Sequence, residues 1–346
     1  MKRRFEFKKM LSLLLAAVLI FGGCGKIEEE KSTETEETVE SGFVKEENPP
    51  ESHVPETQAP PVTEEENPYG DLLLEMEDHG KVIVPAGDLC REEYTADLVA
   101  LEEVLRDFGH NVSLVIESLD GKKALSYNTE KTLFCACTVK APYVLYCLEE
   151  MEKNDISLDF TLTYESEHYE SGTGDMQYSP VGTVFTLETI IDKTLGISDN
   201  VGYRMLVDYF GREGYNAWIS EMGCPSLQIS PTVWSLKAKA KELAFFWREM
   251  EAYFKSDGKY ADFLYSVCTG TASAYATQSL GEVHTSHKSG HNGTGKYLAY
   301  SDAGILWQEN GGYIYSILTD APGLYSSAGA NLMKAAMEII HNKLMN

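Results

Sequence analysis

The chain has 346 residues, of which 43% are hydrophobic and 11% aromatic, so it contains enough apolar material for one large core or two smaller ones. Its formal net charge of -25 argues against nucleic acid as a partner, because such binding needs a basic surface that displaces counterions from phosphates. The seven cysteines are odd in number and lack C-x-x-C spacing. Neither a disulfide framework nor a zinc site is expected, and no other metal or cofactor is predicted.

Residues 1–23 have the pattern of a secretion signal. A basic start is followed by the apolar run Met10–Phe21, which is shorter than the ~20 residues that span a bilayer. Gly22, Gly23 and Cys24 follow and resemble a bacterial lipobox. Cys24 is therefore predicted to be lipidated, which would anchor the protein to the cell membrane on its extracytoplasmic side. The alternative is an ordinary signal peptide with an unmodified cysteine.

Residues 24–88 are predicted to form a disordered tether. Between Lys26 and Tyr69 there are 14 Glu and 3 Lys, and apolar residues show no periodicity. Such a segment cannot bury enough surface to offset its chain entropy, and its like charges and prolines keep it extended. The folded domain is predicted to occupy residues 89–346.

Helices and strands in this domain are predicted from hydrophobic periodicity. A helix at 95–108 is followed by strands at 112–117 and 125–127, which the hairpin turn Asp120-Gly121 connects. Next come a helix at 137–153, a mostly helical stretch at 155–280, strands at 283–288, 297–308 and 313–319, and a last helix at 328–344. This order predicts an α+β fold in which both ends of the chain build one antiparallel sheet flanked by the terminal helices. Residues at about 145–280 would form an all-helical lobe, and a cleft would lie between this lobe and the sheet.

Three short motifs contain the candidate chemistry. Cys137 and Lys140 form C-x-x-K at a predicted helix start, Ser198-Asp199-Asn200 precedes another helix, and Lys288-Ser289-Gly290 lies on a predicted strand. A nucleophile at a helix start benefits from the positive end of the helix dipole, and a lysine three residues later lies on the same face. In a desolvated cleft the pKa of this lysine would fall, so that it could act as a base.

The order of these motifs resembles S-x-x-K, S-D-N and K-T-G of class A β-lactamases and penicillin-binding proteins. Flanking residues resemble the family as well: Ala141-Pro142, Gly172-Thr173-Gly174, His287 and Asp302-Ala303-Gly304. The resemblance covers about residues 90–346, the whole predicted domain. It implies a β-lactamase/transpeptidase-like fold and acyl-enzyme chemistry on a β-lactam or a peptidoglycan stem peptide.

The resemblance also implies which residues take part in the chemical step. Cys137 would be the nucleophile, while Lys140 and Ser198 would move protons. The backbone N–H groups of Cys137 and His291 would form the oxyanion hole, where one donor is typically worth ~2.7–4 kcal/mol.

Substrate binding is implied for a further set of residues. Asn200 would hold a substrate amide. Lys288 and Ser289, followed by Gly290, would bind a substrate carboxylate by charge and hydrogen bonding.

Cys137 departs from the family, because the nucleophile there is serine. Three interpretations stay open: a working thiol nucleophile, a silenced site that still binds ligand, and a slow acyl acceptor that forms a stable thioester. A thiolate at a helix N-terminus beside a cation has a lowered pKa. On the other hand, a site shaped for a hydroxyl need not fit the longer C–S bond, and a misplacement of ~1 Å can cost about a hundredfold in rate.

A second departure lies in the loop that connects the lobes. Class A β-lactamases have a glutamate there that activates water for deacylation, whereas residues 223–235 contain no Asp or Glu and only Gln228 as an amide. No Arg occurs in the predicted C-terminal strands to bind a β-lactam carboxylate, since the last one is Arg248. Efficient β-lactam turnover is therefore not expected.

Two functions follow from these patterns. The first is an extracytoplasmic, lipid-anchored hydrolase of the β-lactamase or penicillin-binding type, in which Cys137 attacks a β-lactam or cell-wall peptide amide. The second is a non-catalytic lipoprotein that binds cell-wall peptides or a protein. A papain-like Cys-His protease is disfavoured, because no motif of that family surrounds Cys137.

Overall fold

The structure is a computed structural model that describes residues 76–230, 236–272, 274–309, 311–323 and 327–346. The predicted signal peptide, Cys24 and residues 24–75 of the predicted tether lie outside these ranges, as do residues 231–235 of the loop discussed above. No helix in the described ranges combines the length and the apolar character that crossing a membrane requires.

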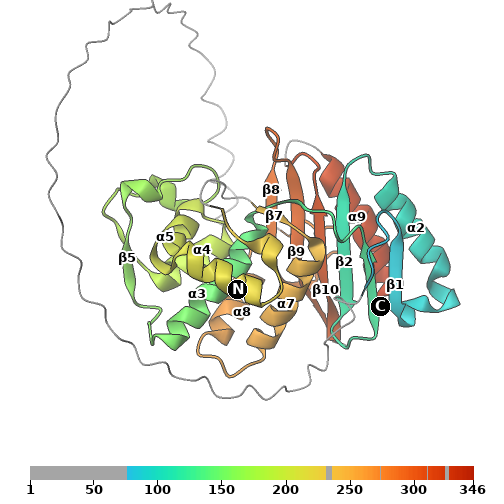
Figure 1. The fold of residues 1–346 in the computed structure, drawn as a ribbon, viewed down its shortest axis with the longest axis horizontal. Helices are drawn as coiled ribbons and strands as arrows, with labels where there is room; N and C mark the ends of the chain where they lie inside the picture. The colour runs from blue at the N-terminus through green and yellow to red at the C-terminus, as the bar shows by residue number, and fades with distance from the viewer. Residues whose placement is uncertain (1–75, 231–235, 273, 310, 324–326) are drawn as a thin grey trace, which may run out of the picture. The chain divides into compact units, whose positions relative to one another are not determined.

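A six-stranded sheet is built from both ends of the domain (Figure 1). In spatial order its strands are β1 (Ile83–Gly87), β3 (Lys123–Tyr127), β2 (Val112–Ser118), β10 (Gly311–Thr319), β9 (Ala299–Gln308) and β8 (His284–Asn292). All neighbouring pairs are antiparallel. The pairing of β2 with β10, in which Val115 lies opposite Ser316, connects the two halves of the chain.

Both faces of this sheet are covered. Along β2, Leu114 and Ile116 belong to the cluster that contains the terminal helices, whereas Val115 belongs to the cluster of the helical lobe, as the two-residue period of a strand requires. The terminal helices are α2 (Thr95–Arg106) and α9 (Ser327–Ile339), and α9 ends in a π-helical turn. The predicted α+β class, with helices from both ends on one antiparallel sheet, is confirmed.

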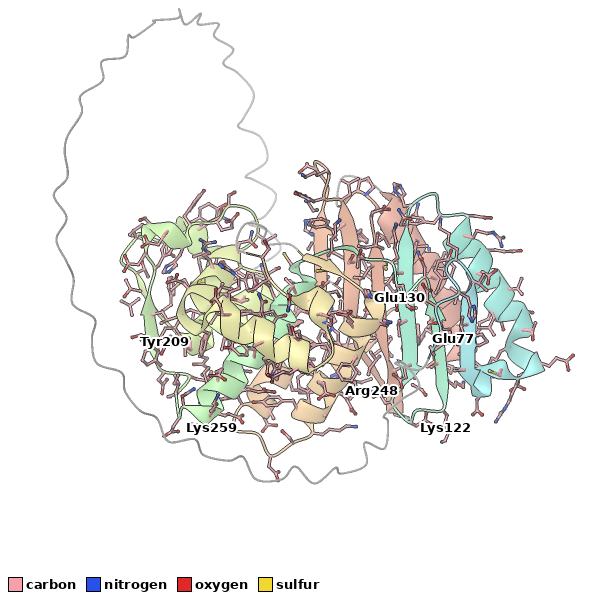
Figure 2. The ribbon with its side chains drawn as sticks, in the orientation of Figure 1. Glu77, Lys122, Glu130, Tyr209, Arg248 and Lys259 are labelled. Atoms are coloured by element: carbon pink, nitrogen blue, oxygen red, sulfur yellow. The ribbon has the colours of Figure 1, made fainter. Side chains whose placement is uncertain are left out.

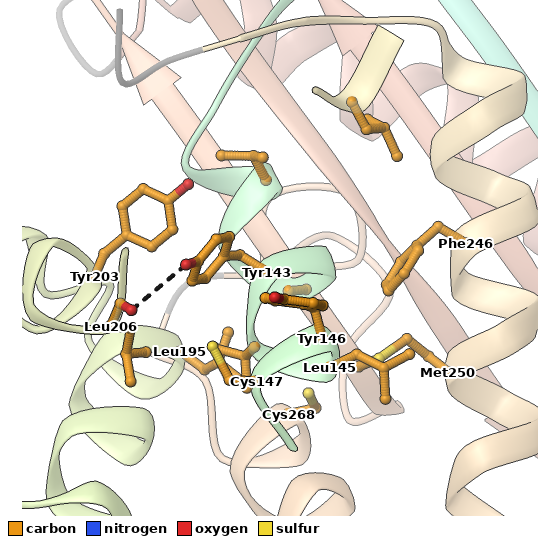
Figure 3. Close-up of a cluster of buried hydrophobic side chains, with 14 of the residues drawn as sticks. Tyr143, Leu145, Tyr146, Cys147, Leu195, Tyr203, Leu206, Phe246, Met250 and Cys268 are labelled. Carbon is orange, nitrogen blue, oxygen red and sulfur yellow. Dashed lines mark hydrogen bonds between the residues drawn. The ribbon is translucent and has the colours of Figure 1, made fainter. Parts of the chain in front are cut away.

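The helical lobe packs around α3 (Lys140–Lys153), whose first nine residues are buried. The other helices of the lobe are α4 (Leu187–Gly196), α5 (Asn200–Phe210), α6 (Arg212–Glu221), α7 (Ala240–Phe254) and α8 (Ala261–Thr269). Figure 3 shows aromatic side chains of α3 at the centre of this core. The Tyr143 hydroxyl donates to the Leu206 carbonyl at 3.4 Å, so the core also fixes α3 against α5.

Two short two-stranded sheets accompany the large sheet. β4 (Leu133–Ala136) pairs with β7 (Leu236–Ala238), and β5 (Thr161–Thr163) pairs with β6 (Val184–Thr186). Just before β4, the Glu130 carboxylate forms ion pairs with Lys239 and Lys241 at the start of α7 (Glu130 is labelled in Figure 2). These ion pairs hold the segment that leads into β4 and α3 against the start of α7.

Two sequence predictions need correction. The predicted tether ended at residue 88, but Ile83–Gly87 is the edge strand β1, because Ile83 is buried and its N–H donates to Glu102 Oε2 at 2.8 Å. The helix predicted from Cys137 begins as a 3₁₀ turn at Cys137–Val139 and becomes α-helical at Lys140.

Candidate active site

The Cys137 thiol lies at a sharp turn between β4 and α3. The preceding residue, Ala136, has φ 48° and ψ -127°, a conformation that is costly for any residue other than glycine and is typical of functional sites. The turn leaves Cys137 half-buried at the N-terminal end of α3. Strand β8 passes close beside it, since a Cβ added to Gly290 would lie 2.6 Å from the Cys137 nitrogen. Glycine at 290 is thus required for this close approach.

Lys140 connects the nucleophile turn to the second motif. Its side chain is 2% exposed, and four acceptors within hydrogen-bonding distance of its Nζ share the three ammonium protons. The acceptors are the Ser198 carbonyl at 2.6 Å, Ser198 Oγ at 3.3 Å, the Asp199 carbonyl at 3.2 Å and Asn200 Oδ1 at 2.7 Å. The ammonium group is therefore held at the hydroxyl of Ser198.

Asp199 and Thr173 fix the backbone of the second motif. The Asp199 carboxylate is buried and caps α5, because Oδ1 accepts from Gly202 N–H at 3.0 Å and Oδ2 from Met176 N–H at 2.8 Å. Ser198 has a left-handed φ of 59°, and the Thr173 hydroxyl donates to its carbonyl at 2.7 Å. Ser198 is thereby presented at the helix start, beside Lys140.

The third motif lies on β8, the edge strand next to the helical lobe. Lys288 is 3% exposed and Ser289 is also buried. The Lys288 Nζ donates to the Ser289 carbonyl at 2.9 Å. Both residues line the same pocket as Cys137.

The electrostatics of the site favour an ionised thiol. Burial alone would raise the pKa of the Cys137 thiol, but the positive charges of Lys140 and Lys288 and a hydrogen bond with Ser198 lower it to about 7. Burial also lowers the pKa of Lys288 to about 8 and that of Lys140 below its ordinary value. Near neutral pH the site can therefore hold a thiolate beside groups that release protons easily.

One pocket joins most of the predicted site residues. Its described lining consists of Cys137, Thr173, Leu195, Gly196, Ile197, Ser198, Thr271, Ala272, Tyr275, Lys288, Ser289, Gly290 and His291. Lys140 is not among these lining residues and lies behind Ser198, to whose hydroxyl it is hydrogen-bonded. Asn200 does not line it, since Oδ1 accepts from Lys140 and Nδ2 donates to the Ser171 carbonyl at 2.9 Å. The roles assigned to these residues, including substrate binding by Asn200, stay predictions.

Some pocket residues were not predicted from the sequence. Thr173 belongs to a Gly-Thr-Gly segment that carried the family resemblance without a predicted role. Thr271 and Tyr275 lie between α8 and β8, in a segment without a recognisable motif. No carboxylate occurs among the described lining residues, and the described ranges hold no group of three side chains suited to a metal ion.

Comparisons with known proteins agree with this fold. Residues 99–344 match the profile of a family described as the β-lactamase enzyme family. A solved structure of PBP-A is 18% identical, with a TM-score of 0.63 over 70% of this chain and 95% of that chain. A mutant of PBP-A, solved as an acyl-enzyme with penicillin G, is 19% identical, with a TM-score of 0.62 over 71% and 94%.

A β-lactamase from Chitinophaga pinensis is 16% identical and has a TM-score of 0.65 over 72% of this chain and 99% of that chain. At such identities the solved structures support the fold alone. A search of curated protein sequences gave no match. The profile match covers well over half of the sequence, and the chain therefore belongs to the β-lactamase enzyme family.

Proposed function

We propose that this protein is an acyl-transfer hydrolase in which the Cys137 thiolate attacks a β-lactam or a cell-wall peptide amide. The observation that carries the proposal is that this thiol, Ser198 and Lys288 line one pocket and that Lys140 is hydrogen-bonded to Ser198 directly behind it. A thiol whose pKa is about 7 supplies its own nucleophile at neutral pH and needs no base to remove its proton.

The proposed reaction has two steps. The thiolate Sγ forms a bond to the carbonyl carbon, and the N–H groups of Cys137 and His291 stabilise the oxyanion. The C–N bond then breaks, and the leaving nitrogen takes a proton from Ser198 Oγ. Lys140 Nζ, 3.3 Å away, gives Ser198 Oγ a proton in return. Water afterwards attacks the thioester carbonyl and the C–S bond breaks, which regenerates the Cys137 thiolate and frees the carboxylic acid. The remaining proton of the water returns through Ser198 Oγ to Lys140 Nζ, which lost one in the first step.

The second step is expected to be slow. No carboxylate occurs among the described lining residues that could activate water, and residues 223–235 contain no Asp or Glu. PBP-A, which has the same fold, has been captured in mutant form as an acyl-enzyme with penicillin G. Accumulation of a thioester at Cys137 is the corresponding expectation here.

The alternative is a non-catalytic binding protein that keeps the pocket. The same lack of a lining carboxylate in the described residues favours it, because binding needs no water-activating group. A ligand that binds reversibly, and equally well after Cys137→Ala, would support this function against the first.

Incubation with penicillin G, followed by intact-mass spectrometry, tests the proposed nucleophile. The wild-type protein is expected to gain one penicilloyl group on Cys137, and Cys137→Ala none. Cys137→Ser is expected to react at least tenfold more slowly, because a serine hydroxyl stays protonated beside the two lysines. Cys90→Ala, which removes an exposed thiol, is the matched control and should react as wild type.

Two outcomes would contradict the proposal. If neither an adduct nor hydrolysis of a chromogenic cephalosporin occurs, the enzymatic function fails for this substrate class. If Cys137→Ser gains activity, the thiol inhibits a site that is otherwise suited to serine.

We further propose that Cys24 carries a lipid anchor outside the cytoplasm. The support is the basic, apolar and small-residue order of residues 2–24. Cells expressing the protein with a labelled fatty acid should yield a labelled, membrane-bound product, and Cys24→Ala an unlabelled one. An unlabelled wild-type product would contradict the proposed lipidation of Cys24.

A further inference from the structure

We propose that a second pocket, at the end of the sheet where β2 begins and β10 ends, binds a phosphate group. Its volume is about 360 Å³, which is within the range of small-ligand sites. None of the described residues that line it also lines the pocket of Cys137. The inference therefore concerns a separate site and does not depend on the proposed function.

Three lysines reach this pocket from separate parts of the chain. Lys131 precedes β4, Lys237 lies on β7, and Lys296 lies in the connection between β8 and β9. All three residues are exposed to solvent. Since the segments are far apart in the sequence, the fold alone brings the three ammonium groups to one cavity.

A group of unpaired lysines is unexpected on so acidic a chain. The chain has 54 acidic and 29 basic residues, and two lysines close by are paired, since Lys239 and Lys241 both bind the Glu130 carboxylate (labelled in Figure 2). Within the described ranges, none of the three pocket lysines has such a partner. Three ammonium groups around one cavity repel one another, and a bound anion would replace this repulsion with attraction.

Asp320 is the one carboxylate among the described lining residues, and it is bound elsewhere. Its Oδ1 accepts from the Asn111 N–H at 2.7 Å and its Oδ2 from Asn111 Nδ2 at 2.6 Å. His110 Nδ1 lies 3.8 Å from the same carboxylate. Asp320 therefore connects the end of β10 to the start of β2, and the three lysines against one aspartate leave the lining positively charged.

An aromatic pair lies between two of the lysines. Phe134 lines the pocket, and its ring centroid is 4.3 Å from that of Tyr297. Lys237 is the cross-strand partner of Phe134 in the pairing of β4 with β7, so both side chains project to the same side. Lys296 Nζ is 4.9 Å from the centroid of the Tyr297 ring. The pocket thus combines ammonium groups with an apolar wall.

The type of cation favours phosphate over carboxylate. A planar carboxylate is matched best by the paired N–H groups of arginine, and the described lining contains no arginine. Ammonium groups act as point charges, and three of them suit an anion whose charge is spread over several oxygens, as in phosphate. The apolar wall formed by Phe134 leaves room for the organic group of a phosphate ester. A free phosphate ester and the headgroup of an anionic lipid share this chemistry.

Calorimetry of the full-length protein with inorganic diphosphate tests the site. One equivalent is expected to bind, with an affinity that falls as the salt concentration rises. Lys131→Gln, Lys237→Gln and Lys296→Gln should each weaken binding about three- to fivefold, the effect of one exposed charge pair, and the triple variant about thirtyfold or more. Lys334→Gln removes an exposed lysine of α9 outside this pocket and is the matched control, with wild-type binding.

Further ligands identify the source of the phosphate and test the selectivity. Tighter binding of monomeric dihexanoyl phosphatidylglycerol than of glycerol phosphate assigns the site to a lipid headgroup, and equal or weaker binding assigns it to a free phosphate ester. Tricarballylate, which has three carboxylates, should bind at least tenfold more weakly than diphosphate. The inference would be overturned by a lack of saturable diphosphate binding, by an equal loss in Lys334→Gln, or by tricarballylate binding as tight as that of diphosphate.

Discussion

Replacing Lys140 or Lys288 with methionine is expected to reduce the reactivity of Cys137 at pH 7 about tenfold or more. Both lysines lower the pKa of this thiol to about 7 against the effect of burial. Without one of them the pKa should rise toward or beyond the ordinary value of ~8.5. Because only the thiolate reacts, the reactive fraction at pH 7 would fall from about half to a few per cent or less.

The pH dependence of alkylation by iodoacetamide checks this expectation. In the wild-type protein the rate at Cys137, followed by peptide mass spectrometry, should rise with pH through a midpoint near 7. In either lysine variant the midpoint should move upward, so that the rates converge at alkaline pH. The exposed Cys90 serves as an internal reference for the reagent.

Controls separate the charge effect from a loss of structure. Lys153→Met, at the exposed C-terminal end of α3, should leave the midpoint at its wild-type value. Lys288→Met is the cleaner variant, because Lys140 binds four acceptors of the second motif, whereas Lys288 donates to the Ser289 carbonyl. A wild-type midpoint at or above ~8.5, or no shift in the lysine variants, would contradict an electrostatically activated thiol.

The thiol and the two lysines influence one another. The Cys137 thiolate raises the pKa of both lysines, while burial lowers it. Their protonation is therefore a property of the set, and measured midpoints belong to the group of three. This coupling suits the proposed reaction, because loss of the thiolate charge on acylation would favour proton release from Lys140 to Ser198.

The longer elements of the fold were predictable from local periodicity. Strands β2, β9 and β10 and helix α2 lie close to their predicted positions, since their alternating or helical patterns extend over many residues. The edge strand β1 was missed because it has five residues, includes Pro85 and follows a charged segment. The three-residue strand β7 depends on pairing with β4, which no local pattern indicates.

The site was predictable only in part. Cys137, Ser198 and Lys288 are separated by long stretches of sequence, and only the order of the motifs indicated that they meet. The hydrogen bond from Lys140 to Asn200 Oδ1 and the position of Tyr275 depend on how helices and loops pack against one another. These features follow from tertiary packing, which no spacing in the sequence encodes.

A buried ion pair gives rise to the largest expected effect on stability. Glu117 on β2 is 0% exposed and forms an ion pair with Arg248 of α7 (labelled in Figure 2). Helix α7 packs against the sheet through β2 and β10. The pair thus crosslinks the helical lobe and the sheet, the two halves between which the pocket of Cys137 lies.

Arg248→Met is expected to lower the free energy of unfolding by about 3–5 kcal/mol, because it leaves the Glu117 carboxylate buried without its partner. The double variant Glu117→Leu/Arg248→Met should recover most of this loss, since apolar side chains of similar size often replace a buried pair at little cost. Urea unfolding measures both, and Arg106→Met, which removes an exposed arginine paired with Glu102, should cost at most about 1 kcal/mol. If Arg248→Met costs no more than this control, the pair does not stabilise the junction of the lobes. If the double variant is as unstable as the single one, the arginine acts through packing of its stem and not through the charge of Glu117.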